Sequence, residues 1–229
     1  MKENCISNNR LPGQNENDFG TYMEGDLHRQ LKAWISMPGD RLEVKYDNYI
    51  VDIVRGDLLL EVQTGSFHTC RKKFEILCQK AKLTVVYPLV LKTYIKYSDK
   101  KARLSPRRRS IFHIFNELSS IGNLLSTPGF SLEVLECSVT EHRERNRSRK
   151  GYSITGRTLL EVLGKRRFVC PGDYFKLFSP SLPKQFTNGD LAEMYSIRRH
   201  LVSALTLTFR RAGMIRLAGK RGRFHLYEY

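Results

Sequence analysis

The sequence predicts an α/β protein with a mixed β-sheet, followed by a small C-terminal unit of two helices and a β-hairpin. Helix-like and strand-like hydrophobic patterns follow one another over about residues 20–90 in the order αβββαβ. Residues 184–229 have a separate order of two helices and two strands. Hydrophobic residues make up 41% of the 229 positions and charged residues 27%, which is enough apolar material for a packed core.

Apolar spacing and turn residues predict the N-terminal elements. Residues 1–18 are Asn-rich without apolar periodicity, which predicts a disordered or loosely attached segment. A helix begins near Glu24, carries Leu27 and Leu31 on one face and ends before Pro38. Three strands, a helix capped by Ser66 and a further strand follow, with expected ranges of 42–46, 49–54, 58–63, 66–80 and 83–87.

The middle of the chain continues the first domain. The pattern predicts an extra hairpin over 93–104, a helix with an apolar face from Ile111 to Ile121, and a strand over 131–139. Residues 141–150 hold no apolar side chain, which is typical of a solvated loop or a strand extension. We therefore expect one domain over residues 19–150 and a connecting segment over residues 151–183.

Residues 184–229 have the element order of a winged helix-turn-helix. Thr187 or Asn188 can cap a short helix over 190–195, a second helix runs from about 197 to 212, and two strands flank a Gly-rich cationic loop at 218–223. In such a unit the second helix can enter a DNA major groove while the hairpin contacts the backbone. The cations placed for these contacts are Arg198, Arg199, Lys220, Arg221 and Arg223.

The charge of the chain is strongly basic and uneven. There are 39 Lys and Arg against 23 Asp and Glu, a formal charge of +16, and residues 104–229 carry +12 of it. This surplus indicates a polyanionic partner, with nucleic acid first and an anionic membrane surface second, and a solubilising surplus without a partner as the alternative. Without a secretory signal, a CxxC pair or an apolar run of about 18 residues, we expect a cytoplasmic protein with reduced thiols and no membrane contact.

Three polar residues lie within strands that are otherwise apolar: Asp52, Glu61 and Gln63. If Gly56-Asp57 is a two-residue hairpin turn, Arg55 pairs with Leu58 and Asp52 lies opposite Glu61, with Cβ atoms about 4.5–5.5 Å apart. Two carboxylates this close repel each other unless a cation lies between them. An oxygen-preferring divalent ion such as Mg²⁺ would balance them, and a purely structural bridge by Arg29 or Arg41 is the alternative.

Asp52 with Glu61-Val62-Gln63, set within the αβββαβ order, resembles the motif of the PD-(D/E)xK, or restriction-endonuclease-like, nuclease superfamily. Val51 stands where the motif has Pro, and Gln63 stands where it has Lys. This ExQ form is similar to the competence-type nucleases of bacteria, and the whole chain resembles an uncharacterised bacterial group of such nuclease-like proteins.

The resemblance implies a site for Mg²⁺ or Mn²⁺ and assigns roles to single residues. Asp52, Glu61 and the carbonyl of Val62 would hold the metal, Gln63 would orient the attacking water, and Glu24 would add an acid from the first helix. Cations on the second helix would hold the substrate backbone, with a solvated helix face as the alternative: Arg71, Lys72 and Lys73.

The implied function is that of a metal-dependent nuclease that hydrolyses DNA phosphodiester bonds and is docked on DNA by the basic C-terminal unit. Because Gln63 cannot act as a cation, a catalytically inactive nuclease fold that serves as a DNA-binding regulator or assembly component is the alternative. A third hypothesis is a module that binds another protein through the winged helix. RNA as the substrate and a homodimer are both compatible with the sequence.

Overall fold

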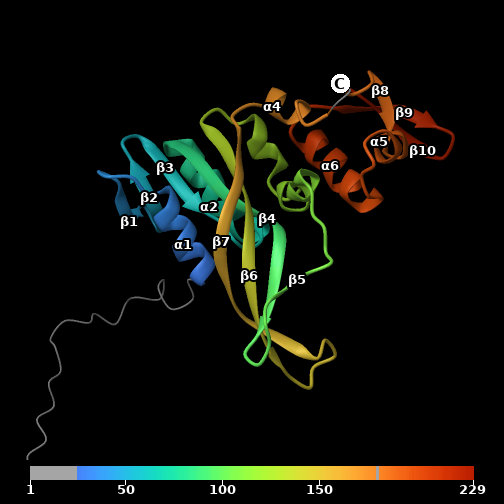
Figure 1. Cartoon of the computed structure of the whole chain (residues 1–229). Coiled ribbons are helices and arrows are strands. Elements are labelled where there is room, and N and C mark those ends of the chain that lie inside the picture. Colours follow the sequence, from blue (N-terminus) through green and yellow to red (C-terminus); the bar gives the residue numbers. More distant parts are fainter. Residues whose placement is uncertain (1–24, 179–180) are drawn as a thin grey trace, which may run out of the picture.

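The computed structural model describes residues 25–178 and 181–229. A mixed seven-stranded sheet lies at its centre, in the order β1-β2-β3-β4-β6-β7 with the short β5 paired to β4 (Figure 1). The strands are β1 Arg41–Tyr46, β2 Tyr49–Arg55, β3 Leu58–Val62, β4 Lys82–Tyr97, β5 Arg103–Leu104, β6 Phe130–Arg145 and β7 Tyr152–Phe168. The expectations for residues 1–18 and for Glu24 lie outside the described residues.

The sheet combines antiparallel and parallel strand pairs. β1, β2 and β3 form an antiparallel meander, whereas β3, β4 and β6 are parallel. β7 returns antiparallel to β6. The parallel strands β3 and β4 require a crossover, which is α2 Phe67–Lys80.

Two helices cover opposite faces of the sheet. α1, Asp26–Ile35, buries Leu27, Leu31 and Ile35 in one apolar cluster. α2 buries Phe67, Phe74 and Leu77 in a second, larger cluster on the other face. The hydroxyl of Ser66 caps α2 by accepting the backbone N–H of His68 at 3.3 Å, as the sequence predicts. The elements from α1 to β4 therefore occur in the predicted order.

β4 is longer than predicted and absorbs one strand of the expected extra hairpin. It runs unbroken for 16 residues and passes through Pro88, while β5 makes the return at Tyr94 and Ile95. β3 last pairs with β4 at Val86. Pro88 lies two residues further on, so its missing N–H faces the side where β3 has ended and no ladder hydrogen bond is lost.

The expectation of a connecting segment over residues 151–183 is wrong for its first half, which forms strand β7 of the large sheet. This 17-residue strand pairs with β6 from Leu132 and Phe168 to Arg145 and Tyr152. The polar stretch 141–150 therefore begins as a continuation of β6, which ends at Arg145. The strand was missed because β7 is half-exposed along its length, so its apolar residues do not alternate cleanly.

The predicted helix over 111–121 is broken into short turns, η1 Ile111–Ile114, α3 Phe115–Leu118 and η2 Gly122–Ser126. These turns support the C-terminal helix α6, Arg199–Arg211. A Cβ atom at Gly122 would lie 2.7 Å from Cβ of Arg211 and 3.0 Å from the carbonyl oxygen of Thr208, so only glycine permits this approach. Ser126 donates its hydroxyl to the carbonyl of Ala212 at 2.6 Å.

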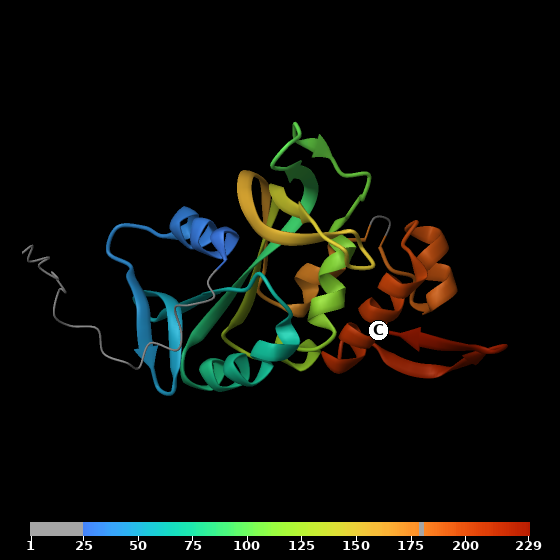
Figure 2. The same cartoon turned by 90° about the horizontal axis from the view of Figure 1, so that it is seen from below.

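The C-terminal unit, drawn in orange and red at the right of Figure 2, is built on a second sheet of three strands in the order β8-β10-β9. The short helix α4, Pro171–Phe175, precedes this unit, whose elements are β8 Gln185–Thr187, α5 Asn188–Met194, α6, β9 Arg216–Arg221 and β10 Phe224–Glu228. The order of two helices and a hairpin is as predicted, whereas β8 is an additional strand. The hairpin strands also extend further, since Arg221 pairs with Phe224 across a two-residue turn.

One apolar cluster joins this unit to the large sheet. Side chains from α2 and β4, such as Phe74 and Leu83, share it with Leu205 and Phe209 of α6 and with Tyr227 of β10. Within the described part of the chain, no helix has the length and apolar character needed to cross a membrane.

Candidate active site

Asp52 and Glu61 lie on neighbouring strands where β2 and β3 separate. The predicted hairpin register is confirmed, because Arg55 pairs with Leu58 and Ile53 with Leu60. One step further, backbone pairing stops, and the carboxylate of Asp52 accepts the backbone N–H of Val62 at 2.8 Å through Oδ2. The side chain of Asp52 thus takes the place of a ladder carbonyl and is fixed beside Glu61.

Lys73 of α2 supplies the cation that two close carboxylates need. Its Nζ lies 2.7 Å from Oε2 of Glu61 and donates to the carbonyl of Ile50 at 2.6 Å. The bridging cation is therefore neither Arg29, which pairs with Asp26 on its own helix, nor the exposed Arg41. The alternative of a solvated helix face does not hold for Lys73, since its side chain is only 21% exposed.

His28 of α1 contacts Asp52 from the other side. Its Nε2 lies 3.3 Å from Oδ1 of Asp52, and both side chains are largely buried. From the sequence, a position on the helix surface is favoured for this histidine. His28 and Lys73 each lie at the edge of an apolar stripe, next to Leu27 and Phe74 respectively, and this edge position is the signal that could have indicated them.

Glu61 is the ionisable group of the cluster whose charged form is least favoured by its surroundings. Burial raises the pKa of Glu61 from 4.5 to about 7; the Lys73 ammonium opposes this shift, and the Asp52 charge adds to it. Its Oε2 accepts from Lys73, but its Oε1 is buried and has no hydrogen-bond partner among the described residues. A buried carboxylate oxygen without a partner is costly, which indicates that a proton or a cation completes this position.

Asp52 has the opposite electrostatic character. Burial raises its pKa, but the hydrogen bond and charge of His28 and the backbone N–H of Val62 outweigh this, so the pKa of Asp52 is lowered from 3.8. The site thus holds a firmly ionised aspartate beside a glutamate that is easily protonated. Groups with pKa values driven apart in this way are typical of functional sites.

Gln63 is bound to the start of α2. Its Nε2 donates to the carbonyl of Ser66 at 3.1 Å, and its Oε1 accepts from Sγ of Cys70 at 3.3 Å. A cavity of about 390 Å³ opens nearby, beside His28, and its wall includes Thr64, the residue after Gln63. Residues of α1 and β7 form the rest of its wall, so the cavity adjoins the side of the cluster where His28 lies.

The metal ligands expected from the sequence are only partly brought together. Asp52, Glu61 and the backbone of Val62 meet as described, while Glu24 lies outside the described residues. Within residues 25–178 and 181–229, no three His, Cys, Asp or Glu side chains are grouped closely enough to hold a metal ion. Any ion here would be held by two carboxylates and completed by carbonyl or water oxygens, which is the usual coordination of Mg²⁺.

The other two cations of α2 differ in their surroundings. Arg71 donates from Nε to Glu75 at 2.8 Å, one turn further along the same helix. Lys72 is exposed. Of the three residues expected to hold a substrate backbone, only Lys73 reaches the carboxylate cluster.

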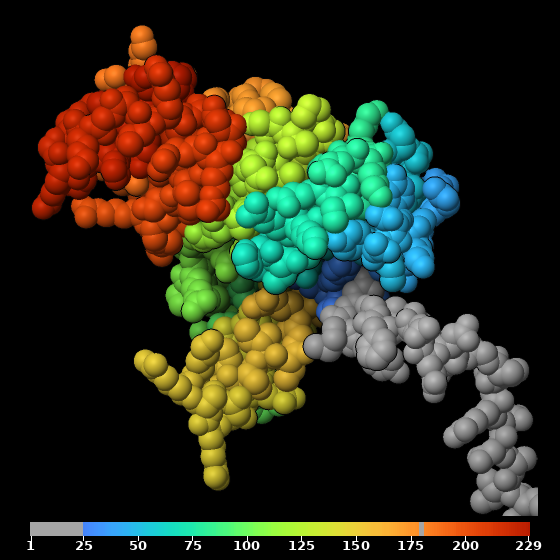
Figure 3. Space-filling view, turned by 180° about the vertical axis from the view of Figure 1, so that it is seen from behind, coloured from blue at the N-terminus to red at the C-terminus, as the bar shows by residue number. Residues whose placement is uncertain are grey.

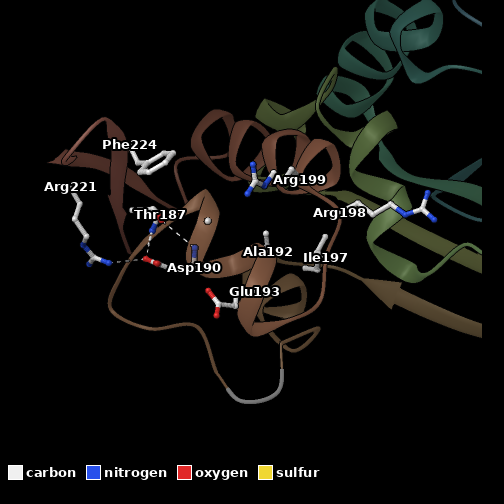
Figure 4. A pocket seen from close by; sticks show the side chains of 10 residues that line it. Thr187, Asp190, Ala192, Glu193, Ile197, Arg198, Arg199, Arg221 and Phe224 are labelled. Carbon is white, nitrogen blue, oxygen red and sulfur yellow. Dashed lines mark hydrogen bonds and ion pairs between the residues drawn. The ribbon is translucent and has the colours of Figure 1, made fainter.

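Three cations of the C-terminal unit, Arg198, Arg199 and Arg221, line a cavity of about 550 Å³ between α5, the start of α6 and the hairpin, together with Asp190 and Glu193 (Figure 4). Arg198 and Arg199 are exposed at the first turn of α6. Arg221 is held by Asp190 at 2.9 Å, and Asp190 also accepts the backbone N–H of Thr187 in the cap of α5. Arg221 therefore fixes the hairpin to α5.

The two remaining hairpin cations lie near the turn. Lys220 is exposed, and the guanidinium of Arg223 lies 5.1 Å from the ring centre of Phe224.

Residues 25–169 match the family described as "Domain of unknown function (DUF8091)". An "Uncharacterized protein" of Treponema pallidum (strain Nichols) is 33% identical over 221 residues, which are 92% of this chain and 87% of that protein. No solved structure matches the chain. The family match ends one residue after β7, so it covers α1 and the whole large sheet but none of the C-terminal unit.

Proposed function

The chain belongs to the DUF8091 family, and we propose that its family domain is a metal-dependent nuclease that hydrolyses phosphodiester bonds of DNA. The observation that carries this proposal is the buried Oε1 of Glu61, which has no partner among the described residues and lies beside the ionised Asp52. The αβββαβ order of α1 to β4 supports the proposal, because it places both carboxylates on the predicted hairpin.

The donor set suits Mg²⁺ or Mn²⁺. Asp52 and Glu61 would hold the ion, with the carbonyl of Val62 as a further oxygen donor, and the buried Oε1 of Glu61 would gain the partner that it lacks. A bound divalent ion supplies two effects, a lowered pKa of water and stabilisation of charge on the phosphate. Hydrolysis joins the oxygen of water to phosphorus, breaks one P–O ester bond and transfers a proton to the departing oxygen.

The protein residues have separable roles in this proposal. His28 and the N–H of Val62 keep Asp52 ionised and fixed in orientation. Lys73 brings its ammonium to Glu61 and can stabilise the negative charge that develops on the phosphate. Lys73 thereby provides, from α2, the positive charge that Gln63 does not provide. Gln63 is a positioning residue that joins the end of β3 to the start of α2.

The C-terminal unit is proposed to be a winged helix that binds DNA. Its helix, helix and hairpin order supports this, as do the exposed Arg198 and Arg199 at the start of α6. Because α6 shares its apolar core with the large sheet, the unit would hold DNA at a fixed position relative to the carboxylate cluster.

The test is cleavage of plasmid DNA, single-stranded DNA and RNA with Mg²⁺ or Mn²⁺. Asp52→Ala and Glu61→Ala should reduce the rate to background, and Lys73→Ala should reduce it about 10²–10³-fold through the loss of charge stabilisation. Asp57→Ala is the matched control, because this carboxylate lies in the exposed turn of the same hairpin and pairs only with the exposed Lys82. All variants must show the thermal stability of a folded protein.

Two results would decide against catalysis. Cleavage that persists in both carboxylate variants places the activity elsewhere or in a contaminant. Salt-sensitive DNA binding without cleavage, unaffected by either substitution, supports instead the DNA-binding regulator or assembly component with an inactive nuclease fold.

A further inference from the structure

A three-stranded arm extends from the sheet beyond the candidate active site. β3 last pairs with β4 at Val62 and Val86, and β4 then continues to Tyr97. These 11 further residues span about 36 Å at about 3.3 Å per residue. β6 and β7 accompany β4 along the arm, and the tip projects freely in the space-filling view (Figure 3). Because β3 and β4 are parallel, the end of β3 that carries Glu61 points toward this tip.

The arm tip, defined here as residues 95–103 and 141–152, is strongly basic. It contains nine Lys and Arg against three Asp and Glu. One of the three acids, Glu141, is already neutralised by Arg143 at 2.6 Å and Arg157 at 2.9 Å. Lys100, Lys101 and Lys150 are exposed, and the structure gives them no ion pair with any described residue. Folding uses little of this charge, so it is available to a ligand.

The tip is also hollowed. A cavity of about 430 Å³ is lined by Tyr97, Lys100, Lys101, Arg103, Lys150 and Tyr152, among others, and its wall includes no acidic residue from the described part of the chain. Two tyrosine rings hold arginine side chains in place. The guanidinium of Arg145 lies 5.7 Å from the ring centre of Tyr97, and that of Arg143 lies 3.9 Å from the ring centre of Tyr152. The cations are thus arranged around a concave surface before any ligand binds.

We propose that the arm tip binds the phosphate backbone of a nucleic acid. A concave wall of cations and aromatic rings without carboxylates suits a phosphodiester chain, because cations follow the backbone and bases stack on aromatic rings. The length of the arm is close to one turn of B-DNA, about 34–36 Å. The tip therefore contacts a duplex about one helical turn from the bond that the candidate site cleaves. Only this last placement rests on the proposed nuclease function.

The test measures binding in EDTA, so that it does not depend on cleavage. The arm variant is Lys100→Gln/Lys101→Gln/Lys150→Gln. The control variant, Arg41→Gln/Lys45→Gln/Lys80→Gln, removes the same charge from exposed positions on β1 and α2. The probes are a 30-base-pair duplex, a 10-base-pair duplex, a 30-nucleotide single strand, and phosphatidylcholine vesicles with phosphatidylserine.

The arm variant should bind the 30-base-pair duplex tens- to a few hundredfold more weakly at 0.1 M salt. The slope of log K against log salt should fall by about 2.7, since each phosphate contact contributes about 0.9. The control variant should stay within a few fold of the natural protein. A photo-crosslinker at the exposed Ala102 should label the duplex, whereas one at the exposed Asn48 should not.

Three outcomes would overturn the proposal: equal weakening by both variants, no weakening by the arm variant, or loss of vesicle binding with duplex binding intact. If the arm variant loses the same affinity for the 10-base-pair as for the 30-base-pair duplex, the placement of the arm tip one helical turn from the candidate site is overturned. If the natural protein cleaves DNA and the arm variant binds normally, the arm inference fails while the nuclease proposal stands. If nothing is cleaved and the arm variant loses binding, the nuclease proposal fails while the binding of nucleic acid by the arm tip stands.

Discussion

Replacement of Glu61 by glutamine tests the electrostatics of the site without any substrate. The pKa of Glu61 is raised by burial from 4.5 to about 7, so the folded protein binds a proton at this position more tightly than the unfolded chain does. Linkage then requires the free energy of unfolding to fall as pH rises from about 4.5 to about 7. Glutamine has nearly the same shape and does not titrate, so Glu61→Gln should lose this dependence.

The magnitude follows from the shift of the pKa. The rise of this pKa from 4.5 to about 7 corresponds to roughly 3 kcal/mol when the full interval is crossed. Between pH 5 and pH 8, the free energy of unfolding should therefore fall by about 2–3 kcal/mol more in the natural protein than in the Glu61→Gln variant. The effect should be absent above pH 8, where Glu61 is ionised in both the folded and the unfolded state.

Urea unfolding at pH 5, 6, 7 and 8 in metal-free buffer measures this difference. Glu75→Gln is the control, because the hydrogen bond from Arg71 lowers the pKa of Glu75, so that removal of this carboxylate cannot abolish a fall of stability with rising pH. If the natural protein and the Glu61→Gln variant have parallel pH profiles, then Glu61 is solvated, and the reasoning from its buried oxygen is refuted.

Three other predictions follow from the same structure. Gly122→Ala should lower the free energy of unfolding by about 1–3 kcal/mol, because its Cβ would clash with α6. Gly172→Ala is the control measured beside it by urea unfolding and should change this free energy little, since its Cβ would have a nearest contact of 3.7 Å. Lys73→Met should leave Glu61 without its cation and destabilise the protein by about 1–3 kcal/mol, with Lys73→Arg largely restoring it in the same assay. Mn²⁺ binding measured by calorimetry should tighten from pH 6 to pH 8, because the proton on Glu61 must leave first; an affinity independent of pH would contradict the assignment of this ligand.

The sequence alone determined the features that depend on neighbouring residues. The two-residue turn at Gly56-Asp57 sets the register of its hairpin, so the opposition of Asp52 and Glu61 follows from counting along the chain. The cap at Ser66 and the one at Thr187 are equally local, since each side chain accepts a backbone N–H within the next three residues.

Only the tertiary structure decided which side chains complete the site. His28 and Lys73 lie 24 and 12 residues from the carboxylates that they contact, on helices that cover opposite faces of the sheet. Their periodicity places them at the edge of an apolar stripe, which fits either a solvated surface or a buried ion pair. The choice depends on how closely each helix packs on the sheet.

The extent of the sheet was likewise a tertiary property. Pro88 interrupts the strand pattern in the sequence, yet β4 continues through it because β3 has already ended on that side. β7 has no strong alternation and is fixed by its pairing with β6, which gives the arm its length. Hydrogen bonds between distant strands, unlike a turn or a helix cap, leave no local pattern in the residues that form them.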